Sequence, residues 1–141
     1  MKILFPTDGS DHSIAALRHL LPRLAWFRET PQLALLNVHP HLPYARAVAW
    51  AGKEAAQRYY DDECTAALAP GGALLAAAGI AFERVERIGD PAAEIGRFAA
   101  EWNADLIAMG RHGHSAVTAL LMGSVTQKVL ATATIPVLLL H

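Results

Sequence analysis

Residues 104–126 read ADLIAMGRHGHSAVTALLMGSVT, an apolar run that leads into a loop with two glycines and then into Gly-Ser-Val-Thr. Leu106–Met109 is apolar at every position, which is typical of a strand in a parallel sheet covered by helices on both faces. Similar runs bounded by turn residues predict five strands in all: Lys2–Thr7, Leu33–Val38, Ile80–Ile88, Asp105–Met109 and Val137–Leu140. The third run alternates more than the others, so we expect it nearer an edge of the sheet.

Helical patterns lie between these strands. One apolar stripe has the spacing i, i+3, i+4, i+7 and consists of Ile95, Phe98, Ala99 and Trp102. Asp90 and Pro91 are typical of a helix start, with Asp90 as the N-cap. Pro22 is expected to bend the first helix because its ring clashes with the preceding turn. Residues 43–78 are interpreted as one long helical segment that is broken or kinked at residues 70–72, Pro-Gly-Gly. Strands that alternate with helices predict an α/β fold with an open, doubly wound sheet.

The composition limits the classes of protein to consider. A chain of 141 residues with 53% hydrophobic residues is expected to form one domain, residues 1–141. The net charge of −1, without a run of like charges, argues against nucleic acid as a partner. Cys64 is the single cysteine and the first residues are too short an apolar run for a signal peptide, so we expect a cytoplasmic protein. The uncharged segment Cys64–Phe82 contains Pro-Gly-Gly and many alanines, so no membrane span is expected.

Two loops that follow predicted strands carry the residues that point to function. The first is Pro6-Thr7-Asp8-Gly9-Ser10, and the second contains Gly110 and Gly113. These two glycines lack a Cβ atom, so their backbone can present several N–H groups to an anion. Gly123 and Ser124 open the last helix, where unpaired N–H groups and the helix dipole attract the same anion. The hydroxyl of Ser124, and that of a threonine two residues later, can add donors. Together the loops predict a phosphate site.

The spacing Gly-x-x-Gly, nine residues, Gly-Ser is similar to the ATP-binding signature of the universal stress protein family. The resemblance covers almost the whole chain, through the Pro-Thr-Asp loop, Gly89-Asp90-Pro91, Ala104-Asp105-Leu106-Ile107 and Ile135-Pro136-Val137. It implies a Rossmann-like, three-layer fold with five parallel strands in the order 3-2-1-4-5 and helices on both faces. It also implies an ATP-binding stress-response protein, in which ATP occupancy changes conformation or partner contacts.

The resemblance assigns roles to individual positions. Asp8 is expected near the ribose, the Val38 main chain at the adenine edge and Met109 against the base. The expected nucleotide-binding set is Pro6, Thr7, Asp8, Val38, Met109, Gly110, His112, Gly113, Gly123, Ser124, Val125 and Thr126. Its glycines and Ser124 would hold the phosphates, and Mg²⁺ would accompany them on the phosphate oxygens.

Some polar and ionisable residues near the predicted site can be interpreted in more than one way. Asp8 can instead cap the helix that begins near Asp11. Lys128, one helical turn after Ser124, can reach a phosphate or stay solvated. Two pairs of histidines lack a neighbouring Cys, Asp or Glu, so no metal site is expected at His39 with His41 or at His112 with His114.

Three functions remain open from the sequence. No general base or activated nucleophile lies in sequence reach of the phosphate loop, so no catalytic residue is assigned and regulatory ATP binding is favoured. The alternatives are slow hydrolysis of ATP or another adenine nucleotide, and a nucleotide-free dimeric interaction module. We also expect a homodimer through the apolar strand Pro136–Leu140. Pro136 marks a sheet edge that needs cover, and the equivalent strand in the family commonly meets its twin.

Overall fold

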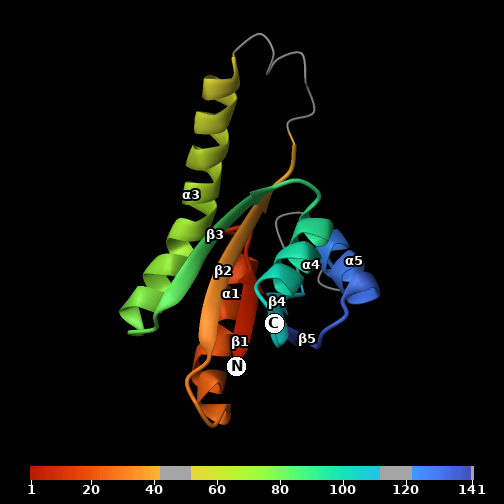
Figure 1. Ribbon diagram of the computed structural model, residues 1–141. Coiled ribbons are helices and arrows are strands. Elements are labelled where there is room, and N and C mark those ends of the chain that lie inside the picture. Colours follow the sequence, from red (N-terminus) through yellow and green to blue (C-terminus); the bar gives the residue numbers. More distant parts are fainter. Residues whose placement is uncertain (42–51, 112–121, 141) are drawn as a thin grey trace.

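The computed structural model describes residues 1–41, 52–111 and 122–140, which form a sheet flanked by helices (Figure 1). The strands run parallel in the order β3-β2-β1-β4-β5. They are β1 (Lys2–Pro6), β2 (Gln32–His39), β3 (Phe82–Ile88), β4 (Leu106–Gly110) and β5 (Val137–Leu140). The predicted strands and their order are confirmed, and β3 lies at an edge, as its alternation indicated.

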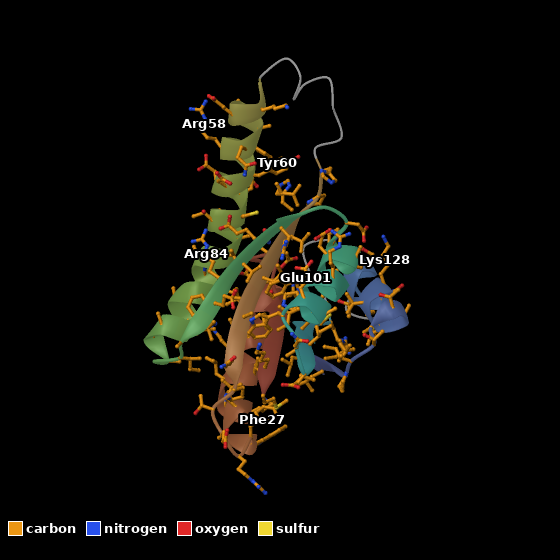
Figure 2. All side chains as sticks on the ribbon, in the orientation of Figure 1. Phe27, Arg58, Tyr60, Arg84, Glu101 and Lys128 are labelled. Carbon is orange, nitrogen blue, oxygen red and sulfur yellow. The ribbon has the colours of Figure 1, made fainter. Side chains whose placement is uncertain are left out.

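Helices cover both faces of this sheet. They are α1 (Asp11–Leu20), the 3-10 helix η1 (Leu21–Trp26), α3 (Lys53–Ala77), α4 (Pro91–Glu101) and α5 (Ser124–Thr132). One core cluster joins Phe5 and Leu35 to α1 and α3, and the other joins Leu4 and Leu36 to α4 and α5. Neighbouring strand residues belong to opposite clusters because successive side chains alternate between the faces. The result is three layers, with charged side chains such as Lys128 on the outside (Figure 2).

The order of the strands fixes where a ligand can bind. β1 is central, and its Ile3 pairs with Leu33 of β2 on one side and Leu106 of β4 on the other. The chain first adds β2 and β3 on one side of β1, and then crosses to add β4 and β5 on the other. All strands run in one direction, so their carboxyl ends share one edge of the sheet. In such sheets the crevice at this edge, where the winding reverses, is the usual ligand site.

Two prolines affect their helices differently from what the sequence predicted. α1 ends at Leu20, and Pro22 lies in the first turn of η1, where a missing N–H breaks no helical bond; the chain changes helix type at this point. α3 is not broken at Pro70 but continues to Ala77. Pro70 and Ala66 are both exposed, so water can bond to the Ala66 carbonyl that Pro70 leaves without a donor.

α3 is a long helix that lies close to the sheet. A Cβ atom added to Gly71 would lie 3.1 Å from Cδ2 of Leu35, so the small residue is what permits this approach. The expected earlier part of the helix, residues 43–51, lies outside the described residues. Within the described ranges, no helix combines the length and the apolar character needed to cross a membrane.

Candidate functional site

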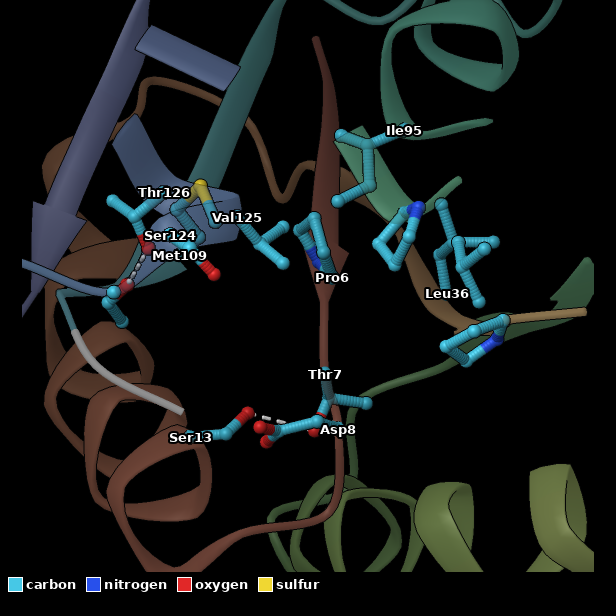
Figure 3. Close-up of a pocket in the computed structure, with 15 residues that line it drawn as sticks. Pro6, Thr7, Asp8, Ser13, Leu36, Ile95, Met109, Ser124, Val125 and Thr126 are labelled. Atoms are coloured by element: carbon cyan, nitrogen blue, oxygen red, sulfur yellow. Dashed lines mark hydrogen bonds between the residues drawn. The ribbon is translucent and has the colours of Figure 1, made fainter. Parts of the chain in front are cut away.

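A cavity of about 290 Å³ lies at the carboxyl ends of β1, β2 and β4, beside the first turns of α1, α4 and α5. Figure 3 shows its side chains around one open space. Ten of the twelve residues predicted to bind the nucleotide line it: Pro6, Thr7, Asp8, Val38, Met109, Gly110, Gly123, Ser124, Val125 and Thr126. The other two, His112 and Gly113, lie outside the described residues.

Five more residues line the cavity and were not predicted to be there: Ser13, Leu36, Pro40, Pro91 and Ile95. The sequence pattern placed Leu36 in a strand and Ile95 in the apolar stripe of a helix, and both do belong to the core. They also reach the cavity, because Leu36 pairs with Pro6 at the last position of β1 and Ile95 lies near the start of α4. The only sequence signal for this is their position near a strand end or a helix start, which does not separate wall residues from core residues.

A series of hydrogen bonds holds the loop between β1 and α1. Asp8 Oδ1 accepts from Ser10 N at 3.0 Å and from Ser10 Oγ at 2.6 Å. Ser10 Oγ accepts in turn from Ser13 N at 3.2 Å, which makes Ser10 the N-cap of α1. The alternative in which Asp8 caps this helix is therefore wrong. Asp8 orients the capping serine and lines the cavity.

Thr7 fixes the point where β1 ends. It is buried, and its N–H donates to Leu36 O at 2.8 Å while its carbonyl accepts from Asn37 Nδ2 at 2.8 Å. Thr7 Oγ1 lies 2.7 Å from Ser13 Oγ and accepts from Gly9 N at 3.1 Å. Backbone and side chain of Thr7 therefore join β2, the loop and α1 at the cavity wall.

At the start of α5, two hydrogen-bond donors have partners other than the expected phosphate. The N–H of Gly123, expected to be unpaired, donates to Arg111 O at 2.9 Å. Thr126 is buried and its hydroxyl donates to Gly110 O at 3.1 Å, so this hydrogen serves the contact between α5 and β4 rather than a phosphate. No described side chain caps the helix, and the N–H groups of Ser124, Val125 and Thr126 have no partner within it, whereas Gln127 N already donates to Gly123 O at 3.0 Å. The helix start remains a donor surface at the cavity.

The start of α4 is capped, as predicted. Asp90 Oδ1 accepts from Ala93 N at 3.1 Å, and Pro91 follows it in the cavity wall. This hydrogen bond, assisted by Lys128, holds the pKa of Asp90 below its ordinary value. Lys128 Nζ lies 3.4 Å from Asp90 Oδ2 and is exposed. Lys128 is thus engaged with a carboxylate at the surface and reaches toward α4.

The end of β2 offers a main-chain acceptor to the cavity. Leu36 O accepts from Thr7 N on the β1 side, whereas His39 O accepts from Gly89 N on the β3 side. Successive carbonyl groups of a strand point to opposite sides, so the carbonyl of Val38 points to the β1 side. β1 has already ended at this level, and Val38 lines the cavity.

The histidines form no recognisable metal site in the described ranges, where no three His, Cys, Asp or Glu side chains are arranged around a possible ion. His39 packs edge-on against Tyr59 and Tyr60, with ring centroids 5.6 and 5.2 Å apart. His39 Nδ1 lies 2.7 Å from Pro40 O. His112 and His114 lie outside the described residues.

Comparison with known proteins agrees with this geometry. The model of the universal stress protein family matches residues 1–141. Universal stress protein MJ0531 of Methanocaldococcus jannaschii is 32% identical over 138 residues, which cover 97% of this chain and 79% of that protein.

Solved structures share the fold over nearly the whole chain. The structure of hypothetical protein MJ0577 superposes with a TM-score of 0.79 at 27% identity, covering 99% of this chain and 94% of the other. A universal stress protein crystallised in complex with cAMP gives a TM-score of 0.72 at 25% identity, covering 100% and 97% of the two chains. An adenine nucleotide is therefore bound by at least one protein similar to this chain.

Proposed function

Since the chain belongs to the universal stress protein family, we propose that it binds an adenine nucleotide, namely ATP, in the cavity at the carboxyl edge of its sheet. The observation that carries the proposal is the start of α5, which no described side chain caps and which opens on a cavity with an apolar wall across from it (Figure 3). A site with donors at one end and apolar surface at the other suits a nucleotide.

The apolar side of the cavity suits the base. Leu36, Ile95 and Met109 approach it from β2, α4 and β4, and they can cover the faces of a flat ring. The carbonyl of Val38 suits the adenine edge, because adenine presents an amino group there. Guanine presents an oxygen at the same position and would be repelled.

The start of α5 suits the phosphates. Its first N–H groups and the positive end of its dipole attract an anion, and the hydroxyl of Ser124 is exposed beside them. In this proposal Gly110 and Gly113 extend the contact along the loop, and Mg²⁺ binds to the phosphate oxygens. Asp8 accepts from the ribose hydroxyls, held in place by its bonds to Ser10.

The proposed role is regulatory binding rather than catalysis. Asp8 is the one ionisable side chain among the described residues that line the cavity, so that part of the wall lacks an acid–base pair. ATP would touch the starts of helices from both faces of the sheet, so its presence or absence can change their relative positions.

We place this function in the cytoplasm, where the single thiol, Cys64, stays reduced. Burial of Cys64 also raises the pKa of its thiol.

Calorimetric titration of the purified protein with ATP, ADP, AMP, cAMP and GTP, with and without Mg²⁺, tests the proposal. We expect saturable binding of one adenine nucleotide per chain. GTP should bind roughly tenfold more weakly, because the carbonyl of Val38 would meet an oxygen. Phosphate release over multiple turnovers, measured in parallel, separates a slow hydrolase from a regulatory binder. A protein that binds none of the adenine nucleotides would instead be an interaction module.

A further inference from the structure

The hydroxyl groups of Thr7 and Ser13 form a pair on the wall of the cavity. Their oxygen atoms lie 2.7 Å apart, and the two residues are 6% and 5% exposed. Thr7 follows β1 and Ser13 lies in the first turn of α1, so the pair joins two elements. Figure 3 draws this bond and places Ser13 across the open space from Ser124.

Among the residues that the structure describes, this pair has one more hydroxyl hydrogen than it has acceptors. It carries two hydroxyl hydrogens, of which the bond between Thr7 and Ser13 uses one. Either hydroxyl can donate in this bond; we assign Thr7 as the donor and Ser13 as the acceptor, because Thr7 Oγ1 already accepts from Gly9 N at 3.1 Å. The hydroxyl hydrogen of Ser13 then has no acceptor among the described residues. A buried donor without an acceptor is costly, so an atom inside the cavity should take it.

We infer that Ser13 is a further ligand-binding residue, which donates this hydrogen to a phosphate oxygen of the bound nucleotide. The inference rests on the proposed function of the cavity. An ionised phosphate oxygen only accepts, which matches a surplus donor. A ribose hydroxyl brings a hydrogen of its own, for which Asp8 in the same loop is the suitable acceptor. Ser13 also lies in the first turn of α1, where the helix dipole favours an anion.

This contact would hold the phosphate from two layers of the molecule. α1 packs on one face of the sheet and α5 on the other. A phosphate that accepts from Ser13 and from the first N–H groups of α5 therefore bridges the two faces at the carboxyl edge. This gives a phosphorylated ligand, but not the nucleoside alone, a means of drawing the two layers together.

The test compares Ser13→Ala with Thr132→Ala, whose hydroxyl donates to Lys128 O within α5 and lies outside the cavity wall. Both variants and the wild type are titrated with adenosine, AMP and ATP, and thermal unfolding checks that each is folded. We expect Ser13→Ala to weaken AMP and ATP roughly tenfold and to leave adenosine within about twofold. Thr132→Ala should change none of the three.

Equal weakening of adenosine and AMP by Ser13→Ala would place the contact at the base or ribose and overturn the inference. Unchanged affinity for AMP and ATP would overturn it as well. Both outcomes require a wild type that binds nucleotide. A wild type that binds none of these ligands would instead contradict the proposed function, so the two failures can be told apart.

Discussion

Gly9 links the loop that carries Asp8 to the long helix α3. Its φ is +75°, and a Cβ atom added there would lie 2.8 Å from both the Cα and the carbonyl oxygen of Ala67. These are backbone atoms, so no side-chain rotation could relieve the contact. α3 therefore limits where this loop, and with it the cavity wall at Asp8, can lie.

We predict that Gly9→Ala destabilises the protein and weakens nucleotide binding. Left-handed strain and overpacking against α3 together should lower the free energy of unfolding by roughly 3 kcal/mol. The loop must also shift, which moves Asp8 away from the ribose. Urea unfolding and calorimetric titration with ATP measure the two effects.

Gly79 supplies the matched control for this substitution. Its φ is +68°, but an added Cβ atom would have nothing within 4 Å. Gly79→Ala should therefore cost only about 1 kcal/mol, from strain alone, and leave the affinity for ATP unchanged. If the two variants lose the same stability and both keep wild-type affinity, the contact between Gly9 and α3 has no influence on the site.

At the scale of single elements, the starts of three helices meet at the cavity, and they are not equivalent. Ser10 caps α1 and Asp90 caps α4, whereas α5 has Gly123 at its N-cap position and no cap from any described side chain. Gly123 has φ −58° and ψ 145°, a conformation that other residues adopt without strain. A capping residue can therefore be introduced at this position.

We predict that Gly123→Asp stabilises the fold and abolishes tight ATP binding. The new carboxylate would cap α5 and interact with its dipole, which should raise the free energy of unfolding by roughly 0.5 kcal/mol. The same carboxylate occupies the donors and repels the phosphates, so the affinity for ATP should fall by more than about tenfold. Thermal unfolding without ligand and calorimetric titration measure the two effects.

Gly123→Asn separates charge from size in this experiment. Asn caps a helix about as well as Asp but carries no charge, so it should weaken ATP less. Adenosine should bind both variants as it binds the wild type. An Asp variant with wild-type affinity for ATP would show that the phosphates do not bind at the start of α5.

The elements themselves were predictable because their signals are local. Leu106–Met109 reads as a buried strand from its own four residues, and β4 contains it. Asp90 was predicted as an N-cap from its own type and the proline after it, and its bond to Ala93 confirms this. The resemblance to the family, which the glycine spacing made specific, named twelve binding residues, and ten of them line one cavity.

The contacts between elements could not be predicted, since they depend on how the elements pack. Gly123 N–H was expected to be free, but it donates to Arg111 O where the chain passes close to the end of β4. Ser13 reaches Thr7 only because the loop between them turns back. Pro70 leaves α3 unbroken because of its exposed position, and its residue type alone does not encode that position.

At the scale of the whole molecule, the two edges of the sheet differ in chemistry. β3 carries Arg84 and Arg87, which pair with Glu86 and Glu101 (Figure 2). Charged pairs on an edge strand discourage the addition of another strand. β5 (Val137–Leu140) is apolar at every position and carries no charge. We therefore propose that two copies of the chain meet through β5, in a two-fold symmetric dimer.

The backbone of β5 provides a direct test of this dimer. Pro136 O and Leu140 O accept from Ile107 N and Arg111 N on the β4 side, so alternation turns the N–H of Leu139 outward. Leu139→Pro removes this outward N–H donor and also the leucine side chain. Leu139→Ala removes the leucine side chain as well but keeps the N–H donor. We predict a dimer for the wild type and the Ala variant, and a monomer for the Pro variant, by light scattering at micromolar concentration. A monomeric wild type, or a dimer that survives Leu139→Pro, would contradict pairing through β5.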